Sequence, residues 1–198
     1  MVINEEILLK NGAVIQEYIA GQTIFLEGSL PKYYFQIREG LIKLNTYRED
    51  GTEFIHSLPS GGHCFAETFL WSDYPYCVNA VTVSDTVIIK LLKTNFMAMI
   101  DNNRDMMHNL FRHNSERMFY RHKMLTTLSI NDSSHRINKV LEFLKTHHQI
   151  KEPFKFKVPF SRQQLANLTG LRVETVIRTV KKLERENLIR ICDGRICV

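Results

Sequence analysis

The charged side chains between Arg172 and Arg185 recur at a spacing that places them on one face of a helix. Apolar residues interleave with them at steps of three and four, which predicts a helix from about 172 to 186 with one buried stripe: Val173, Val176, Val180 and Leu183. The opposite face then presents Arg172, Glu174, Arg178, Lys181 and Arg185. Guanidinium and ammonium groups in such a row can bind a polyanion, and a guanidinium can donate two parallel hydrogen bonds to one partner. The chemistry that this pattern offers is recognition of a nucleic acid.

The distribution of charge supports a polyanionic partner for this part of the chain. The 198 residues carry a formal net charge of +5. Residues 132–198 contain 14 Lys and Arg against 7 Asp and Glu, whereas the residues before them contain 12 against 14. A basic C-terminal third behind a near-neutral remainder indicates that a polyanion meets only that third. A basic helical bundle with a solvated charged face stays open as the alternative.

The residues on both sides of the charged helix predict how it is held. Ser161 with Gln164 three residues later is a capping box, and it opens a short helix whose Leu165 and Leu168 face a core. Gly170 then turns the chain, and two short helices joined by a glycine turn form a helix-turn-helix.

Two further features complete a domain over residues 132–198. The runs 188–192 and 195–198 are joined by Asp193-Gly194, which predicts a hairpin of the kind called a wing. We also expect a short helix over 137–144, capped from within 131–134, and a strand over 154–158. The sequence therefore predicts a winged helix-turn-helix.

The stretch 165–189 resembles the DNA-binding signature of the Crp/Fnr superfamily, the cyclic-AMP receptor protein and fumarate–nitrate regulator type. The run 170–178, Gly-Leu-Arg-Val-Glu-Thr-Val-Ile-Arg, is very similar to the fumarate–nitrate branch. The resemblance covers nearly the whole chain. It implies an α+β fold with an N-terminal double-stranded β-roll like a cyclic-nucleotide-binding domain, a long dimerisation helix and a C-terminal winged helix-turn-helix. It also implies a transcription regulator that binds double-stranded DNA as a homodimer and contacts RNA polymerase.

The resemblance assigns roles to individual side chains. Arg178 is similar to the family arginine that reads guanine O6 and N7, and Glu174 to the acid that accepts from cytosine N4, which implies a TTGA-like or GTGA-like half-site. Arg172, Thr175 and Ile177 complete the base-reading set, and Arg172 at the family's third reading position leaves the outer bases open. The expected phosphate contacts are Ser161, Arg162, Gln163 and Lys181.

Short runs rich in β-branched and aromatic residues, separated by glycines, indicate strands in the first part of the chain. They are residues 24–26, 34–37, 41–44, 54–58 and 86–91. Asp50-Gly51 between two of these runs favours a hairpin. Regular spacing of this kind is typical of a small barrel or a double-sheet roll, so we expect residues 1–93 to form the β-roll.

A segment without glycine or proline follows, and we expect a long dimerisation helix over 94–131. Seven positions repeat at steps of four and three, the spacing of a coiled-coil seam: Met107, Phe111, Asn114, Met118, Arg121, Leu125 and Leu128. Polar Asn114 and Arg121 fit a dimer seam, because a buried polar residue there selects register and oligomeric state. A helix that simply lies on the roll is the alternative.

The effector-pocket candidates of the roll are Ala66, Glu67, Thr68, Cys77 and Val78. The run 62–68 resembles the floor of the family's phosphate-binding cassette, whose cyclic-nucleotide binders use a Gly-Glu pair and, further along, an Arg-Ser pair. Here Ala66 replaces the glycine, and Cys77-Val78 contains no arginine. Burying a phosphate without a guanidinium is costly, so we expect no cyclic-AMP binding, and we expect Glu67 to cap backbone amides.

The identity of an effector stays open. Haem bound by His63, Cys64 or Cys77 is one alternative, and a ligand-free roll that acts through protein contacts is another. We expect no cofactor.

Other classes of function fit the sequence poorly. The four cysteines do not form the C-x2-C pairs of a zinc site, so we expect no metal. His56, His63 and Glu67 lack the spacing of a cupin-like metalloenzyme, the remaining enzymatic alternative, and we expect no enzyme. The sequence contains no run of 18 consecutive apolar residues, so we expect no membrane span. Glu5 and Glu6 stand where a signal peptide needs positive charge. We therefore expect a cytoplasmic protein.

Overall fold

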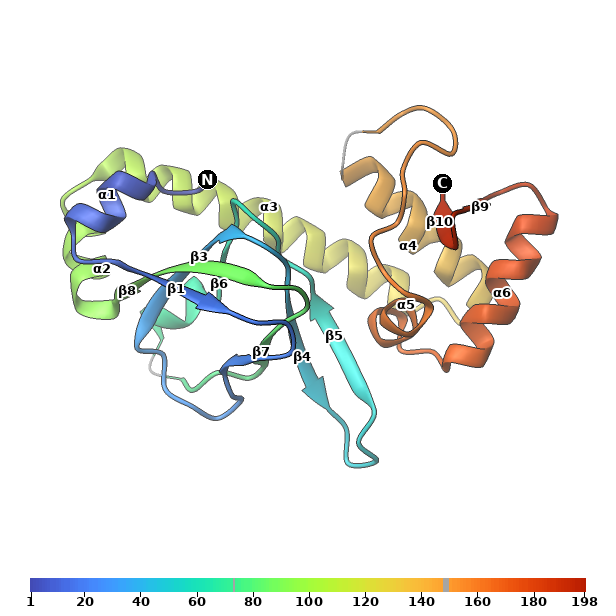
Figure 1. Ribbon diagram of the computed structural model, residues 1–198, viewed down its shortest axis with the longest axis horizontal. Coiled ribbons are helices and arrows are strands. Elements are labelled where there is room, and N and C mark those ends of the chain that lie inside the picture. Colours follow the sequence, from blue (N-terminus) through green and yellow to red (C-terminus); the bar gives the residue numbers. More distant parts are fainter. Residues whose placement is uncertain (73, 148–149) are drawn as a thin grey trace. The chain divides into compact units, whose positions relative to one another are not determined.

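The computed structural model describes residues 1–72, 74–147 and 150–198. It divides into two compact units, Met1–Met118 and Phe119–Val198, which are described separately below (Figure 1). The division falls within one long helix, α3 (Arg104–Leu128). Among the described helices, none combines the length and the apolar character that a membrane span requires.

The first unit contains two four-stranded antiparallel sheets, which confirms the predicted α+β class and the β-roll (Figure 1). One sheet has the order β1 (Val14–Tyr18), β8 (Thr86–Leu92), β3 (Tyr33–Glu39) and β6 (Cys64–Phe65). The other has the order β2 (Thr23–Phe25), β7 (Asn79–Thr82), β4 (Ile42–Tyr47) and β5 (Glu53–Ser57). Alternate side chains of each strand face opposite sides, so a strand can contribute to two cores.

Each of the five runs expected to be extended contains a strand, and the turn at Asp50-Gly51 joins β4 to β5. Three strands were not predicted: β1, β6 and β7. β6 is two residues long, and most of β1 is exposed, so neither has the alternating burial that a sequence pattern could reveal. One glycine has an essential role, because a Cβ on Gly40 (φ +100°) would lie 2.4 Å from Thr86 Oγ1.

The inner faces of the sheets meet in an aromatic core. Phe25 stacks on Tyr76 with ring centroids 3.8 Å apart, and Phe35 stacks on Phe65 at 5.2 Å. Val78 and Ala66 are buried in the same cluster. Large rings therefore fill the middle of the roll.

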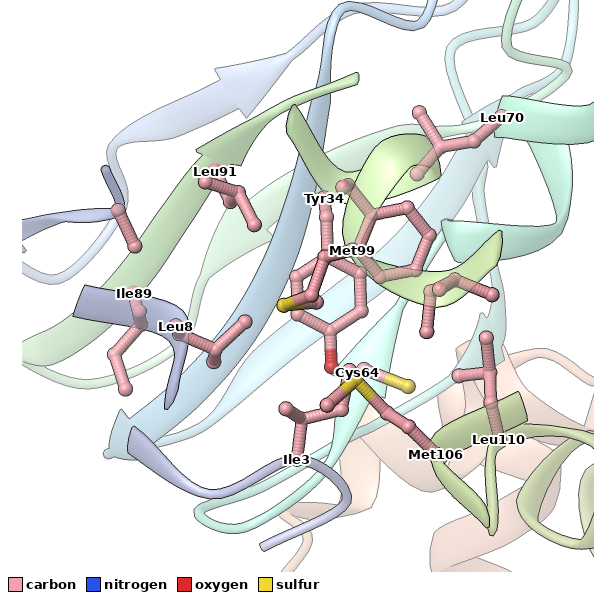
Figure 2. Packing of buried hydrophobic residues seen from close by; sticks show 13 residues of the cluster. Ile3, Leu8, Tyr34, Cys64, Leu70, Ile89, Leu91, Met99, Met106 and Leu110 are labelled. Atoms are coloured by element: carbon pink, nitrogen blue, oxygen red, sulfur yellow. The ribbon is translucent and has the colours of Figure 1, made fainter. Parts of the chain in front are cut away.

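Helices cover the outer face of the first sheet. They are α1 (Glu5–Lys10), the 3-10 helix η1 (Glu67–Trp71), α2 (Lys93–Asp101) and the beginning of α3. Figure 2 shows the second core, in which Tyr34, Ile89 and Leu91 from the strands meet Met106 and Leu110 from α3. Tyr34 stacks on Phe96 of α2 with ring centroids 4.4 Å apart.

The segment expected to form one long helix over 94–131 is two helices. α2 ends at Asp101, and the side chain of Asn103 accepts a hydrogen bond from the Met106 amide at 3.0 Å to begin α3. Asparagine competes with helical hydrogen bonding through its own side chain, so consecutive Asn102 and Asn103 allow the break. The expectation of one unbroken helix was wrong at this point.

The described residues of the second unit form the end of α3, three further helices and a hairpin, and the three helices and the hairpin were predicted. They are α4 (Ser133–His147), α5 (Arg162–Thr169), α6 (Val173–Arg185), β9 (Arg190–Cys192) and β10 (Arg195–Cys197). Asp132 caps α4, because its Oδ1 accepts from the His135 amide at 2.6 Å.

The strand predicted over 154–158 is instead an extended segment that makes one isolated bridge, between Lys157 and Cys197. Phe156 and Val158 are buried and Lys155 and Lys157 exposed, so the alternation was predicted correctly. The Val158 amide donates to the Ile196 carbonyl at 2.8 Å. Phe154 has a positive φ (60°), which is not an extended conformation. The extended segment therefore cannot include this residue, and a longer ladder does not form.

Candidate nucleic-acid interface

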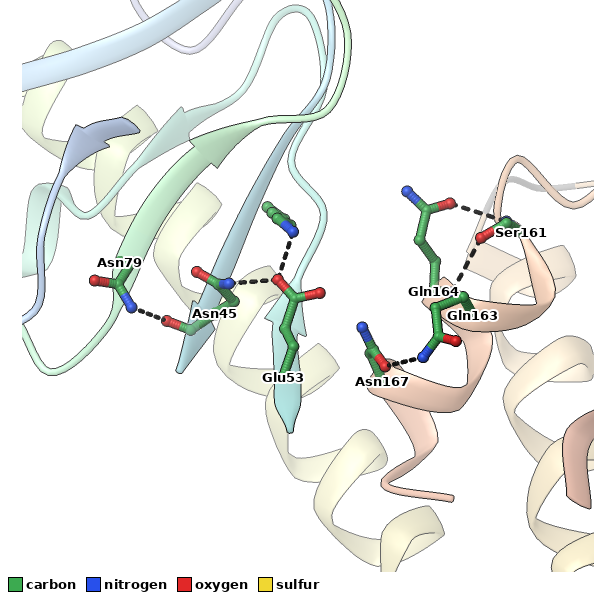
Figure 3. Close-up of polar contacts among 8 residues, drawn as sticks. Asn45, Glu53, Asn79, Ser161, Gln163, Gln164 and Asn167 are labelled. Carbon is green, nitrogen blue, oxygen red and sulfur yellow. Dashed lines mark hydrogen bonds and ion pairs between the residues drawn. The ribbon is translucent and has the colours of Figure 1, made fainter. Parts of the chain in front are cut away.

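The first helix of the helix-turn-helix is fixed by local hydrogen bonds. The Ser161 hydroxyl accepts from the Gln164 amide at 3.1 Å, and the Gln164 side chain accepts from the Ser161 amide at 2.9 Å (Figure 3). This is the predicted capping box. α5 ends at Gly170, whose left-handed backbone (φ 67°) turns the chain toward α6. Leu165 and Leu168 are buried, as expected.

α6 is strongly two-sided. Val176, Val180 and Leu183 are buried, and Val173 at the first turn is half-buried. On the other side Arg172, Glu174, Arg178, Lys181 and Arg185 are exposed. The helix is therefore held by its apolar stripe, and its charged face is left to solvent.

Glu174 and Arg178 lie one helical turn apart on this exposed face. Within the described part of the chain, neither side chain makes a hydrogen bond or an ion pair. Ile177 is exposed, Thr175 is half-buried, and Arg172 is the N-cap residue of α6 without a side-chain capping bond. The five predicted base-reading residues thus gather on the first turns of one helix.

The predicted phosphate-contact residues differ in the hydrogen bonds that their side chains form within the protein. The Arg162 guanidinium donates to the Gly194 carbonyl at 2.8 Å, which ties α5 to the turn of the hairpin. The Gln163 amide donates to Asn167 at 2.9 Å, and the Ser161 hydroxyl belongs to the capping box (Figure 3). Lys181 is exposed. Arg162 has four further N–H donors, so its internal bond still leaves it able to meet a phosphate.

The wing is a tight hairpin. Asp193 (φ 49°) and Gly194 (φ 75°) both have positive φ, the requirement of the favoured two-residue turn. The Lys157 ammonium lies 3.2 Å from the Asp193 carboxylate, and both groups are exposed, so this ion pair contributes little. The wing places the Arg195 side chain at the surface of the same unit.

The predicted seam residues on α3 divide into two groups. Phe111, Met118 and Leu125 are spaced by seven and are 71%, 51% and 66% exposed. Asn114 is half-buried and Arg121 is exposed. Met107, however, packs against the second core of the roll, and Leu128 is half-buried. Phe119, 60% exposed, was missed because it lies outside the spacing that was followed.

The effector-pocket candidates fall into two environments. Thr68 and Cys77 are exposed, whereas Ala66 and Val78 are part of the aromatic core. Ala66 keeps a left-handed backbone (φ 57°), although it stands where the family's cyclic-nucleotide binders have glycine.

Glu67 is fully buried and pairs with Arg117 of α3. Nη1 of Arg117 lies 2.6 and 2.7 Å from the two carboxylate oxygens and also donates to the Cys64 carbonyl at 3.3 Å. The expectation that Glu67 caps backbone amides was therefore wrong. Its partner comes from 50 residues away, and no local pattern could reveal it.

The surroundings of this ion pair affect its titratable neighbours. Burial, and then the negative charge of Glu67, raise the pKa of the Cys64 thiol well above its ordinary value. Burial raises the pKa of the Tyr34 hydroxyl in the same way. Burial and the nearby Arg117 charge lower the pKa of His113, whose Nε2 is buried without a hydrogen-bond partner among the described residues.

Comparison with known families finds two matches in this chain. Residues 15–103 match the cyclic nucleotide-binding domain family, and residues 135–198 match the Crp-like helix-turn-helix domain family.

Curated relatives cover most of the chain. The cyclic AMP receptor protein of Thermus thermophilus is 27% identical over 179 residues, which is 90% of this chain and 81% of the relative. A probable transcriptional activator of Rhizobium leguminosarum is 25% identical over 87% of this chain and 71% of the relative.

Solved structures share the fold. The c-di-GMP responsive global regulator CLP of Xanthomonas campestris aligns with a TM-score of 0.80 at 18% identity, covering 98% of this chain and 96% of that chain. FixK2 of Bradyrhizobium japonicum aligns with a TM-score of 0.78 at 17% identity, covering 94% and 92%. At this level of identity the likeness concerns the fold alone.

Proposed function

The chain belongs to the Crp/Fnr superfamily of DNA-binding transcription regulators, and we propose that it reads an inverted repeat of the TTGA-N6-TCAA kind as a homodimer. Members of this superfamily are regulators rather than enzymes. RNA polymerase is the partner that a regulator of this type would contact, and the cytoplasm is where it would meet its DNA.

The main support is the pair Glu174 and Arg178. Both are exposed one turn apart, opposite the buried stripe of α6, so both can enter a major groove together. An arginine there can donate two hydrogen bonds to guanine, and a carboxylate can accept from the cytosine amino group. A symmetric dimer presents this pair twice, which requires two half-sites roughly 34 Å apart.

Selection from a library of random duplexes tests the proposal. We expect a palindromic consensus with a G·C pair at one fixed position in each half-site. An unstructured or non-palindromic consensus would overturn the assignment of the base-reading residues.

We further propose that cyclic AMP is not an effector of this chain. Val78 is packed among aromatic rings in the core of the roll, at a position where the family's nucleotide binders carry a polar residue. Glu67 is already paired with Arg117, so a ligand would have to break a buried ion pair. Calorimetry with cyclic AMP should detect no binding in the micromolar range, and a micromolar dissociation constant would refute the proposal.

A further inference from the structure

A cavity of about 500 Å³ in the roll is lined by residues of β1, β2, β3 and β8 and of the segment between β2 and β3. Rings contribute to its wall from the first sheet (Tyr18 and Tyr33), from β2 of the second sheet (Phe25) and from the segment before β7 (Tyr76). None of the five effector-pocket candidates lines it, and neither does Arg117. This cavity is therefore distinct from the Glu67 region, and its volume suits a small organic molecule.

Two lysines, Lys32 and Lys90, line the cavity, and none of the lining residues that the structure describes is acidic. The Lys90 ammonium lies 4.2 Å from the centroid of the Tyr33 ring and 3.3 Å from Oε1 of Gln16. Among the described residues, neither lysine forms an ion pair. Two ammonium groups without a carboxylate create a positive potential that favours an anion.

The tyrosines add neutral donors and flat apolar surface. Burial raises the pKa of Tyr76 to about 12 and raises the pKa of Tyr18 as well. Both hydroxyls therefore stay protonated at neutral pH and can donate hydrogen bonds. Their rings, with Tyr33 and Phe35, offer faces and edges on which a planar group can stack.

We propose that this cavity binds a small aromatic carboxylate, with its ring among the tyrosine and phenylalanine side chains and its carboxylate facing Lys32 and Lys90. An inorganic anion would leave the rings unused, and a neutral aromatic molecule would leave two cations uncompensated. A planar ring matches the stacked walls better than a flexible acyl chain does.

Calorimetry on the full chain without DNA tests this inference, so its outcome is independent of the proposed DNA site. The probes are benzoate, phenylacetate and indole-3-acetate, compared with the neutral amides of the same acids and with octanoate and inorganic phosphate. At least one aromatic acid should bind with a Kd below ~1 mM, and its amide should bind at least about tenfold more weakly.

Two charge-removing variants locate the site. Lys90→Met and Lys32→Met should each weaken the binding of the aromatic acid by about tenfold. Lys10→Met changes an exposed lysine of α1 outside the cavity and should leave the affinity unchanged. The proposal is overturned if no aromatic acid reaches a Kd below ~1 mM, if octanoate or phosphate binds more tightly than every aromatic acid, or if both cavity variants bind like the unmodified protein. Using both variants guards against one of them failing to fold.

Discussion

At the scale of single residues, Glu174 and Arg178 form no side-chain hydrogen bond or ion pair among the described residues, whereas Arg162 and Gln163 of α5 are partly engaged. Arg162 holds the wing turn and Gln163 bonds to Asn167. A side chain that is unbonded in the free protein has no internal hydrogen bond to lose on binding, so the donors of Arg178 and the acceptors of Glu174 are all available to a base.

The first prediction separates base reading from charge. Arg178→Ala should lose about 1–3 kcal/mol of binding free energy per half-site on specific DNA, because the contact with two hydrogen bonds to guanine is lost. The preference for guanine at that position should also relax. Lys181→Ala, on the same exposed face, should weaken specific and scrambled DNA alike. Gel-shift titrations on both duplexes measure this. Equal losses on specific and scrambled DNA for Arg178→Ala would mean that the face binds only through charge.

The second prediction concerns the buried ion pair of the roll. Arg117→Met leaves the Glu67 carboxylate buried without its partner, so the free energy of unfolding should fall by about 3–5 kcal/mol. Glu67→Gln combined with Arg117→Met removes both charges and should recover a large part of that loss. Urea unfolding of the unmodified protein, of the single variants Arg117→Met and Glu67→Gln, and of the double variant gives the coupling free energy between the two side chains. A double variant as unstable as Arg117→Met alone would show that the pair matters through packing rather than charge.

The third prediction follows from the lowered pKa of His113. Its folded-state pKa lies below the unfolded value, so below about pH 6.5 the unfolded chain binds more protons, and stability falls as pH falls. His113→Gln cannot titrate and should lose less stability than the unmodified protein between pH 7.5 and 5.5. Urea unfolding at the two pH values checks this. An identical loss in both proteins would assign the acid sensitivity to other groups.

At the scale of elements, the exposed apolar side chains of α3 need a partner. Phe111, Met118 and Leu125 recur every seven residues, the repeat of a coiled-coil seam, and half or more of each side chain is exposed. Exposed rows of large apolar side chains on a helix mark an association surface. The half-buried Asn114 falls on the same repeat.

The fourth prediction therefore concerns assembly. Light scattering should give a dimer mass at micromolar concentration for the unmodified protein. Met118→Glu should give a monomer and lose tight DNA binding at the same time, because two buried carboxylates would face each other across the axis. Lys123→Glu, an exposed change elsewhere on α3, should remain a dimer. A dimer that survives Met118→Glu unaltered would place the seam on another face.

At the scale of the whole molecule, positive charge is concentrated in residues 132–198, and the rest of the chain is slightly acidic. Phosphate binding releases counterions, so DNA affinity should fall steeply with salt. Each phosphate contact contributes about 0.9 to the slope of log K against log salt, and a dimer loses two contacts for each residue removed.

The fifth prediction uses that slope. Lys181→Ala should lower its magnitude by about 2, whereas Lys10→Ala, in the first unit, should not change it. Fluorescence anisotropy between 50 and 300 mM salt measures both slopes. A lower slope with Lys10→Ala would mean that the roll also contacts the DNA backbone.

What the sequence determined by itself was local. The Ser161–Gln164 capping box, the Gly170 turn, the valine stripe of α6 and the Asp193-Gly194 hairpin each depend on residues a few positions apart. Their geometry follows from the period of the helix and from residues that adopt a positive φ. Both can be predicted from the spacing and types of nearby residues. The face that presents Glu174 and Arg178 could be predicted for the same reason.

Tertiary structure decided the rest, because it depends on residues that are distant in sequence. Packing separated Val78 from Cys77 and placed Val78 among stacked rings, although the two are neighbours in the chain. It paired Glu67 with Arg117 across 50 positions, because a buried carboxylate needs a cation and α3 supplies one there. It also brought Lys90 of β8 and Lys32, which directly precedes β3, to one cavity although they are 58 positions apart in the chain. Burial and charge at such places are properties of the folded surroundings, which neither helix period nor turn chemistry encodes.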